Sequence, residues 1–257
     1  MNPFKQHLCL LALTLAAFAA TAQTPAPANW PAPVSTATVI TNTAVIPVPR
    51  TETNILARQA LVLQRAKDAP GDYDIEFIGD SITQGWESRG SNVWYQYYGS
   101  RKVINFGVSG DRTQHVLWRF NQGQLSGIKA KVAVVMIGTN NSGKGRNTES
   151  EILAGVDAIV QQIRFRQPDT KILLLGIFPR GHAFNDQRGS LLQVNQALAR
   201  LADGVNVFYL DFGSKYVEND GTIAKNIMPD YLHPNEAGYR IWADAIEPKL
   251  KELLGEK

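Results

Sequence analysis

Residues 132–141 read Val-Ala-Val-Val-Met-Ile-Gly-Thr-Asn-Asn, an apolar run that leads directly into a polar loop. Consecutive apolar positions are typical of a strand buried on both faces of a parallel sheet. In such sheets ligands bind beyond the carboxyl ends of the strands, so functional side chains are expected in this loop. The loop continues as Ser142-Gly143-Lys144-Gly145, which also resembles a P-loop nucleotide site. However, Gly145 stands where a P-loop needs a hydroxyl for Mg²⁺, which disfavours the nucleotide interpretation.

The same alternation of apolar runs and amphipathic segments extends along residues 50–257. Apolar side chains recur at helical spacing in residues 112–120, 152–163 and 191–201, and again from Asn235 onward, with a kink expected at Pro248. The expected strands are Ile75–Gly79, Val103–Phe106, Val132–Ile137, Lys171–Gly176 and Val205–Leu210. The pattern predicts a three-layer α/β/α sandwich around a five-stranded parallel sheet, of the flavodoxin-like type.

The first 22 residues have the features of a cleavable secretory signal peptide. Lys5 and His7 precede an apolar run over residues 8–20 that is too short to span a bilayer, and residues 20–22 form a small-x-small cleavage site. We therefore expect a secreted or periplasmic protein without stable membrane insertion after signal removal. The single cysteine, Cys9, would leave with the signal, so no disulfide is expected. Residues 23–49, rich in Pro, Ala and Thr, are expected to be a linker before one domain of residues 50–257.

Charge and histidine spacing exclude several classes of function. Without Lys5, 25 basic residues face 23 acidic ones, a net charge of +2 with both signs interspersed, so nucleic-acid binding is not expected. The four histidines show no spacing typical of a metal site, and no cofactor or metal is implied. The G-x-S-x-G motif of the usual α/β-hydrolases is absent.

Four polar blocks lie at the expected strand ends and before the last helix. They are Gly79-Asp80-Ser81, Gly107-Val108-Ser109-Gly110, Gly138-Thr139-Asn140-Asn141 and Asp230-Tyr231-Leu232-His233. Each is weak alone, because a serine after a strand is usually a helix cap and a glycine-rich segment is usually a turn. Together they contain the parts of a serine hydrolase. Ser81 can be the nucleophile, with His233 as its base and Asp230 as the acid that orients the base, and the oxyanion donors can be the N–H groups of Ser81 and Gly110 and the Asn140 amide.

In this order the blocks resemble those of the SGNH or GDSL-type ester hydrolases. Within that group the chain is most similar to the catalytic subunits of intracellular platelet-activating-factor acetylhydrolase, through NFGVSGDRTQHVLWRF (105–120), VVMIGTNN (134–141), IRFRQPDTKILLLGIFPRG (163–181) and DYLHPNEAGY (230–239). The resemblance implies a catalytic triad of Ser81, Asp230 and His233 and an oxyanion hole of Ser81, Gly110 and Asn140. The third block departs slightly, reading G-T-N-N where many members have G-x-N-D.

The sequence therefore predicts a secreted serine ester hydrolase that removes short acyl groups. The resemblance favours acetyl, and export favours a carbohydrate, so a small-molecule or polysaccharide ester is the expected partner. A phospholipid or lysophospholipid ester is the alternative substrate, and a non-catalytic carbohydrate-binding domain is an alternative of another class. The related subunits form dimers, so a homodimer is a further expectation from the resemblance.

Other chemically active side chains have simpler interpretations. His115 is expected to pack on its helix, and Asp80 to cap or support the serine turn. Asp111 and Arg112 could form a local ion pair, and His182 could line the rim of the pocket. Trp86, Trp94, Tyr95, Tyr97 and Tyr98 are expected mainly in the core rather than against a sugar.

Overall fold

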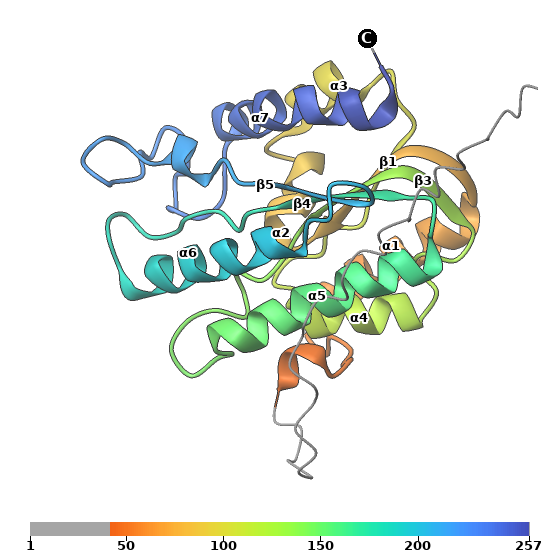
Figure 1. The fold of residues 1–257 in the computed structure, drawn as a ribbon, viewed down its shortest axis with the longest axis horizontal. Coiled ribbons are helices and arrows are strands. Elements are labelled where there is room, and N and C mark those ends of the chain that lie inside the picture. The colour runs from red at the N-terminus through yellow and green to blue at the C-terminus, as the bar shows by residue number, and fades with distance from the viewer. Residues whose placement is uncertain (1–41, 257) are drawn as a thin grey trace, which may run out of the picture. The chain divides into compact units, whose positions relative to one another are not determined.

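The computed structural model describes residues 42–256, so the expected signal peptide and residues 23–41 of the expected linker lie outside the described residues. One five-stranded sheet runs through the domain in the order β2-β1-β3-β4-β5, and every neighbouring pair is parallel (Figure 1). This confirms the predicted parallel α/β fold. The strands are β1 (Gly71–Gly79), β2 (Val103–Asn105), β3 (Ile128–Met136), β4 (Lys171–Leu175) and β5 (Val207–Leu210).

Two strands start earlier than their apolar runs. β1 begins at Gly71 rather than Ile75, and β3 begins at Ile128 rather than Val132. In these extensions the two strands pair with each other while buried and more exposed positions alternate, so charged residues interrupt the apolar run.

Helices cover both faces of the sheet, as Figure 1 shows. Side chains from α1, α4, α5 and α6 join one buried cluster, and side chains from α2, α3 and α7 join the other. The helices of the first layer are α1 (Thr53–Asp68), α4 (Thr113–Asn121), α5 (Glu149–Arg166) and α6 (Asp186–Leu198). Those of the second are α2 (Ser81–Gln84), α3 (Ser91–Tyr98) and α7 (Glu236–Leu254), and α7 continues past Pro248.

The apolar run of β3 divides between the two clusters because successive strand residues point to opposite faces. Val132, Val134 and Met136 pack in the cluster with α3 and α7. Ala133 and Val135 pack in the cluster with α4, α5 and α6. The continuous apolar run therefore reflects a central strand covered on both sides.

The strand order places a topological switch point between β1 and β3, because the chain continues from β1 to β2 on one side and from β3 to β4 on the other. Ligands bind at such points in open α/β sheets. Gly79 of β1 and Met136 of β3 are paired in register at this edge. The loops carrying Ser81 and Asn140 begin just beyond them.

The first described residues pack against the domain. The short 3₁₀ helix η1 (Thr43–Val45) contacts α4 and α5, and Thr113 donates from its hydroxyl to the Ala44 carbonyl oxygen at 2.7 Å. The main-chain N–H of Val48 donates to the carbonyl oxygen of Gln114 at 3.3 Å. Residues 42–49, which end the expected linker, are thus part of the packed structure.

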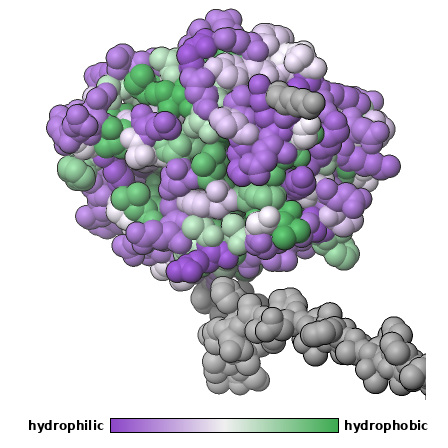
Figure 2. Space-filling view, turned by 45° about the horizontal axis from the view of Figure 1, so that its top comes forward, coloured by the Kyte–Doolittle hydropathy of each residue, from purple (hydrophilic) through white to green (hydrophobic). Residues whose placement is uncertain are grey.

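The outer surface mixes polar and apolar side chains. On the face shown in Figure 2, hydrophobic residues lie in small groups among hydrophilic ones. Within the described range, none of the helices combines the length and the apolar character needed to cross a membrane.

Candidate active site

Ser81 is the first residue of α2, directly after β1. Asp80 caps this short helix, because its Oδ1 accepts a hydrogen bond from the Ile82 N–H at 3.0 Å. Gly79 allows the close approach: a Cβ there would lie 2.1 Å from Thr83 Oγ1 and 2.5 Å from the Met136 carbonyl oxygen. The serine is thus held on a tight strand-to-helix turn, where its N–H has no intrahelical partner.

Ser81 lies in hydrogen-bond contact with His233, and His233 with Asp230. The Ser81 Oγ to His233 Nε2 distance is 2.9 Å, and the His233 Nδ1 to Asp230 Oδ2 distance is 2.6 Å. Asp230 Oδ1 also accepts from the His233 N–H at 2.7 Å. Partial burial acts to raise the pKa of Asp230, but its hydrogen bonds with the His233 amide and imidazole outweigh that effect, so the pKa lies below its usual value. The carboxylate is therefore charged at neutral pH.

The loop that joins Asp230 to His233 depends on an unusual backbone conformation. Tyr231 has a φ of 59°, and it is the one residue other than glycine with a positive φ in residues 42–256. Residues other than glycine rarely adopt this left-handed backbone conformation. Here it turns the chain sharply enough for two residues three positions apart to meet.

Gly110 and Asn140 come from the loops after β2 and β3. Gly110 has a φ of 74°, which favours glycine, and a Cβ there would lie 3.1 Å from the guanidinium of Arg50. Asn140 donates from Nδ2 to the carbonyl oxygen of Asp111 at 2.9 Å, and the same atom lies 3.4 Å from Asp80 Oδ2. The structure therefore gathers all five residues singled out from the sequence at one edge of the sheet.

Asp80 is a buried acid next to this group, with 1% of its surface exposed. Burial raises the pKa of its carboxyl to about 7, and the Ile82 amide and the Arg180 guanidinium offset only part of that effect. Asp80 therefore titrates near neutrality, beside both Ser81 and Asn140.

The ion pair expected between Asp111 and Arg112 is absent from the structure. The buried Asp111 carboxylate pairs instead with Arg50, at 3.1 Å, and with the buried Arg119 of α4. The N–H of Arg112 donates to His115 Nδ1 at 3.0 Å at the start of α4, and burial lowers the pKa of His115 to about 4. His115 is thus a neutral side chain that supports a helix end.

The aromatic residues that flank Ser81 are mostly in the core. Trp86 and Tyr98 are fully buried and pack with Phe77, Tyr239 and Trp242. Tyr95 differs, with 74% of its surface exposed. The core interpretation therefore holds for Trp86 and Tyr98 but not for Tyr95.

A cavity of about 450 Å³ adjoins the Asp230–His233 loop. Its polar lining includes Arg180, His182, Gln187 and Asp230, with Tyr231 and Leu232 completing one wall. His182 thus lies at the cavity, as one interpretation of the sequence suggested. Arg180 was missed from the sequence, although its position just after β4 is a signal by the rule that points to strand ends.

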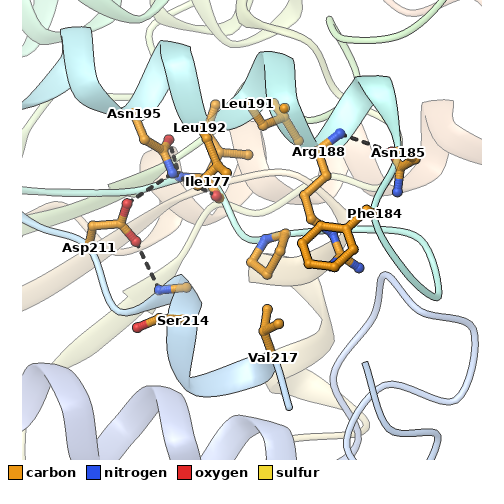
Figure 3. A pocket seen from close by; sticks show the side chains of 13 residues that line it. Ile177, Phe184, Asn185, Arg188, Leu191, Leu192, Asn195, Asp211, Ser214 and Val217 are labelled. Atoms are coloured by element: carbon orange, nitrogen blue, oxygen red, sulfur yellow. Dashed lines mark hydrogen bonds between the residues drawn. The ribbon is translucent and has the colours of Figure 1, made fainter. Parts of the chain in front are cut away.

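A larger cavity of about 580 Å³ lies to one side, between α6 and the segment after β5 (Figure 3). Its walls are largely apolar, with Ile177, Leu191, Leu192, Phe184 and Val217, and the carboxylate of Asp211 stands at one end. Ser81 and His233 line neither cavity, but the smaller one is lined by Asp230 and is therefore the nearer of the two to Ser81 and His233. Phe184 and Asn185 line both cavities, which are therefore neighbours.

No group of three or more His, Cys, Asp or Glu side chains that could hold a metal ion occurs in the described part of the chain.

Comparisons with known proteins agree with this geometry. Residues 77–241 match the GDSL-like Lipase/Acylhydrolase family. The human platelet-activating factor acetylhydrolase IB subunit alpha2 is 40% identical over 184 residues, covering 71% of this chain and 78% of that protein.

Among solved structures, a putative platelet activating factor from Streptococcus pneumoniae has a TM-score of 0.63 at 24% identity, covering 76% of this chain and 92% of that one. A catalytic mutant of an acetylxylan esterase from Geobacillus stearothermophilus has a TM-score of 0.55 at 19% identity, covering 72% and 95%. At these identities the two structures show a shared fold.

The fold, the gathered polar blocks and the related sequences define an ester hydrolase. More particularly, the chain belongs to the GDSL-like lipase/acylhydrolase family, which confirms the resemblance seen in the sequence blocks.

Proposed function

We propose that this protein is an exported serine esterase that removes acetyl groups from carbohydrates. The observation that carries the catalytic part is the chain of contacts from Ser81 Oγ to His233 Nε2, at 2.9 Å, and from His233 Nδ1 to Asp230 Oδ2, at 2.6 Å. A nucleophile in contact with a base, which is in turn oriented by an acid, is the arrangement that hydrolytic serines need.

The mechanism has two steps. His233 takes the Ser81 proton as Oγ attacks the ester carbonyl, and the oxyanion is held by the N–H groups of Ser81 and Gly110 and by the Asn140 amide. His233 then returns its proton to the departing alcohol, which leaves an acetylated Ser81. In the second step His233 deprotonates a water that attacks this ester, and acetate leaves as Ser81 regains its proton.

Three points support the carbohydrate part of the proposal. The expected signal peptide would direct the chain out of the cytoplasm. Acetylated polysaccharides are found outside it. The cavity beside the Asp230–His233 loop has mainly polar walls together with the rings of Tyr231 and Phe184, which suits hydroxylated ligands. The fold is also that of an acetylxylan esterase.

A second candidate is an acetylated phospholipid. The apolar cavity that shares Phe184 and Asn185 with the polar one could accept an alkyl chain (Figure 3). The related mammalian subunits are named as acetylhydrolases of platelet-activating factor, a lipid.

Acetate release would separate the two substrates. We expect faster release from acetylated xylan or pectin than from an acetylated phospholipid, and p-nitrophenyl acetate should be cleaved faster than longer p-nitrophenyl esters. Turnover of the lipid alone would overturn the carbohydrate proposal. Acetate release by a Ser81→Ala variant would overturn the serine mechanism.

A further inference from the structure

Arg180 lines the polar cavity beside the Asp230–His233 loop. Its Nη1 donates to the carbonyl oxygen of Thr139 at 3.2 Å and to the hydroxyl of the same residue at 3.1 Å. Thr139 immediately precedes Asn140, so these bonds anchor the guanidinium next to the proposed oxyanion hole. Within residues 42–256 the other nitrogens of Arg180 have no hydrogen-bonded acceptor, so one edge of its planar fork is available to a ligand.

The charge of Arg180 has no carboxylate partner in the described part of the chain, although the side chain is half-buried. Two other shielded arginines do have one, since Arg58 pairs with Glu87 and Arg101 with Glu247, whereas the buried Arg188 donates only to main-chain carbonyl oxygens, from all three of its nitrogens. Burial lowers the pKa of Arg180, and Asp80 offsets this effect only in part. A half-buried cation without a partner is costly unless something else pairs with it.

The two acids nearest to Arg180 are already engaged. Asp230 accepts from His233 Nδ1 and from two backbone amides. Asp80 accepts from the Ile82 N–H and lies against the Asn140 amide. Neither makes an ion pair with Arg180, so an anion entering the cavity would not have to displace either of them.

Two further nitrogen-bearing side chains lie at or near the cavity, His182 in its lining and Lys225 beside Tyr231. His182 packs against Tyr231 with their ring centroids 4.9 Å apart, and the amino group of Lys225 lies 5.7 Å from the same tyrosine ring. Apart from Asp230, no acidic side chain lines the cavity. Its electrostatic character therefore suits a negatively charged ligand.

We propose that this cavity binds the alcohol half of the ester and selects substrates that carry an anionic group near the acetyl ester, with Arg180 as the partner of that group. The inference rests on the proposed esterase function, because the cavity matters only if Ser81 is the nucleophile. The anion is a carboxylate or a phosphate, since the guanidinium fork matches two oxygens of either group. A uronic acid in an acetylated polysaccharide would supply the first, and a phospholipid head group the second.

Matched esters test the proposal. Acetate release is measured from an acetylated methyl galacturonoside and from the corresponding neutral methyl galactoside, and from an acetylated glycerophospholipid and its neutral acylglycerol counterpart. For the wild type we expect a higher kcat/KM on at least one anionic member of these pairs. In Arg180→Gln, kcat/KM on that ester should fall about 10- to 100-fold, mainly through KM, because a charge-assisted hydrogen bond is lost. The pair that shows this loss identifies the source of the anion.

Two controls isolate the charge. Arg180→Lys keeps the charge and should retain part of the preference, and Lys144→Gln removes an exposed cation outside the cavity and should retain all of it. In Arg180→Gln, the loss of kcat/KM on p-nitrophenyl acetate, which carries no anionic group, should be smaller than the loss on the anionic ester. Two results would overturn the proposal. The first is an equal loss of kcat/KM on neutral and anionic esters in Arg180→Gln. The second is a wild type that shows no preference for the anionic member in either pair. Failure to cleave even p-nitrophenyl acetate would instead overturn the esterase function itself.

Discussion

The side-chain amide of Asn140 donates to the main-chain carbonyl oxygen of Asp111 at 2.9 Å. This bond joins the loop after β3 to the turn that contains Gly110. It uses one hydrogen of Nδ2, and the other acceptor near this nitrogen is Asp80 Oδ2, at the longer distance of 3.4 Å. A substrate oxyanion could replace that weaker contact without disturbing the stronger one.

Adjacent asparagines should therefore respond differently to substitution. Asn140→Ala removes one oxyanion donor, and we expect kcat to fall roughly 10²- to 10³-fold with little change in unfolding free energy. Asn141 is fully buried and bonds to Thr113 and Gln114 of α4, so Asn141→Ala should lower the unfolding free energy by about 2 kcal/mol. Steady-state kinetics and urea unfolding measure the two effects. A normal kcat in Asn140→Ala would remove this residue from the oxyanion hole.

Replacement of Ser81 tests the nucleophile. Ser81→Ala should lower kcat on the order of 10⁶-fold if the three residues act as a unit, as they do in serine proteases. Ser88→Ala is the matched control, because Ser88 lies a few residues along the chain and the hydrogen bond from its hydroxyl, to the Gly85 carbonyl oxygen, is long at 3.4 Å. The control should keep full activity on p-nitrophenyl acetate, and a comparable loss in both variants would point to misfolding.

Ionisation of Asp80 should shape the pH dependence of the reaction. Its pKa is raised to about 7, so above neutrality a negative charge develops beside Asn140 and opposes the oxyanion. Asp80→Asn keeps the oxygen that accepts from Ile82 but removes the charge. We expect kcat/KM of the variant at pH 9 to exceed that of the wild type about tenfold, with near-equal values at pH 5.5. Parallel pH profiles would show that Asp80 does not influence the reaction.

Glu76, in the centre of β1, is a residue whose substitution should increase the stability of the fold. Its side chain is fully buried, neither carboxyl oxygen accepts a hydrogen bond of good geometry in residues 42–256, and burial raises its pKa to about 8, with the nearby Gln167 side chain offsetting only part of that effect. The folded state therefore holds a proton that the unfolded state releases above its ordinary pKa of 4.5. The wild type should lose stability as pH rises from that value to about 8.

Replacement of Glu76 checks that sign. Glu76→Gln carries no charge to bury, so it should raise the unfolding free energy by on the order of 3 kcal/mol at pH 7 and by only about 1 kcal/mol at pH 5. Urea unfolding at the two pH values measures the difference. A gain that is equal at both would mean that the carboxyl is not protonated by burial.

The sheet could be predicted from the sequence because buried parallel strands are apolar at every position, as in residues 132–137. Helix α1 could not be predicted in the same way. Only Gln59, Val62 and Ala66 of that helix are buried, while Leu56 and Leu61 are exposed, so its apolar residues do not mark the face that packs.

Some contacts of the candidate site could be expected from the sequence, and others could not. Short sequence blocks pointed to Ser81 and His233 as candidates because Ser81 follows a strand end and Asp230 and His233 share the block before the last helix. The partners of Asp111 were not visible, because Arg50 comes from 61 positions earlier in the chain and Arg119 from two turns along α4. The neighbour in sequence, Arg112, is held in an extended conformation at the start of the helix instead.

Residues 42–50 pack against the domain and support the turn that contains Gly110. Arg50 donates to the Ser109 carbonyl oxygen at 2.7 Å and pairs with Asp111, so it holds both sides of the Gly110 turn. A protease that cut the chain just after Arg50 would leave every residue of the proposed triad in place while releasing the support of the oxyanion hole. Loss of the segment up to Arg50 should therefore lower kcat without removing any residue of the proposed triad.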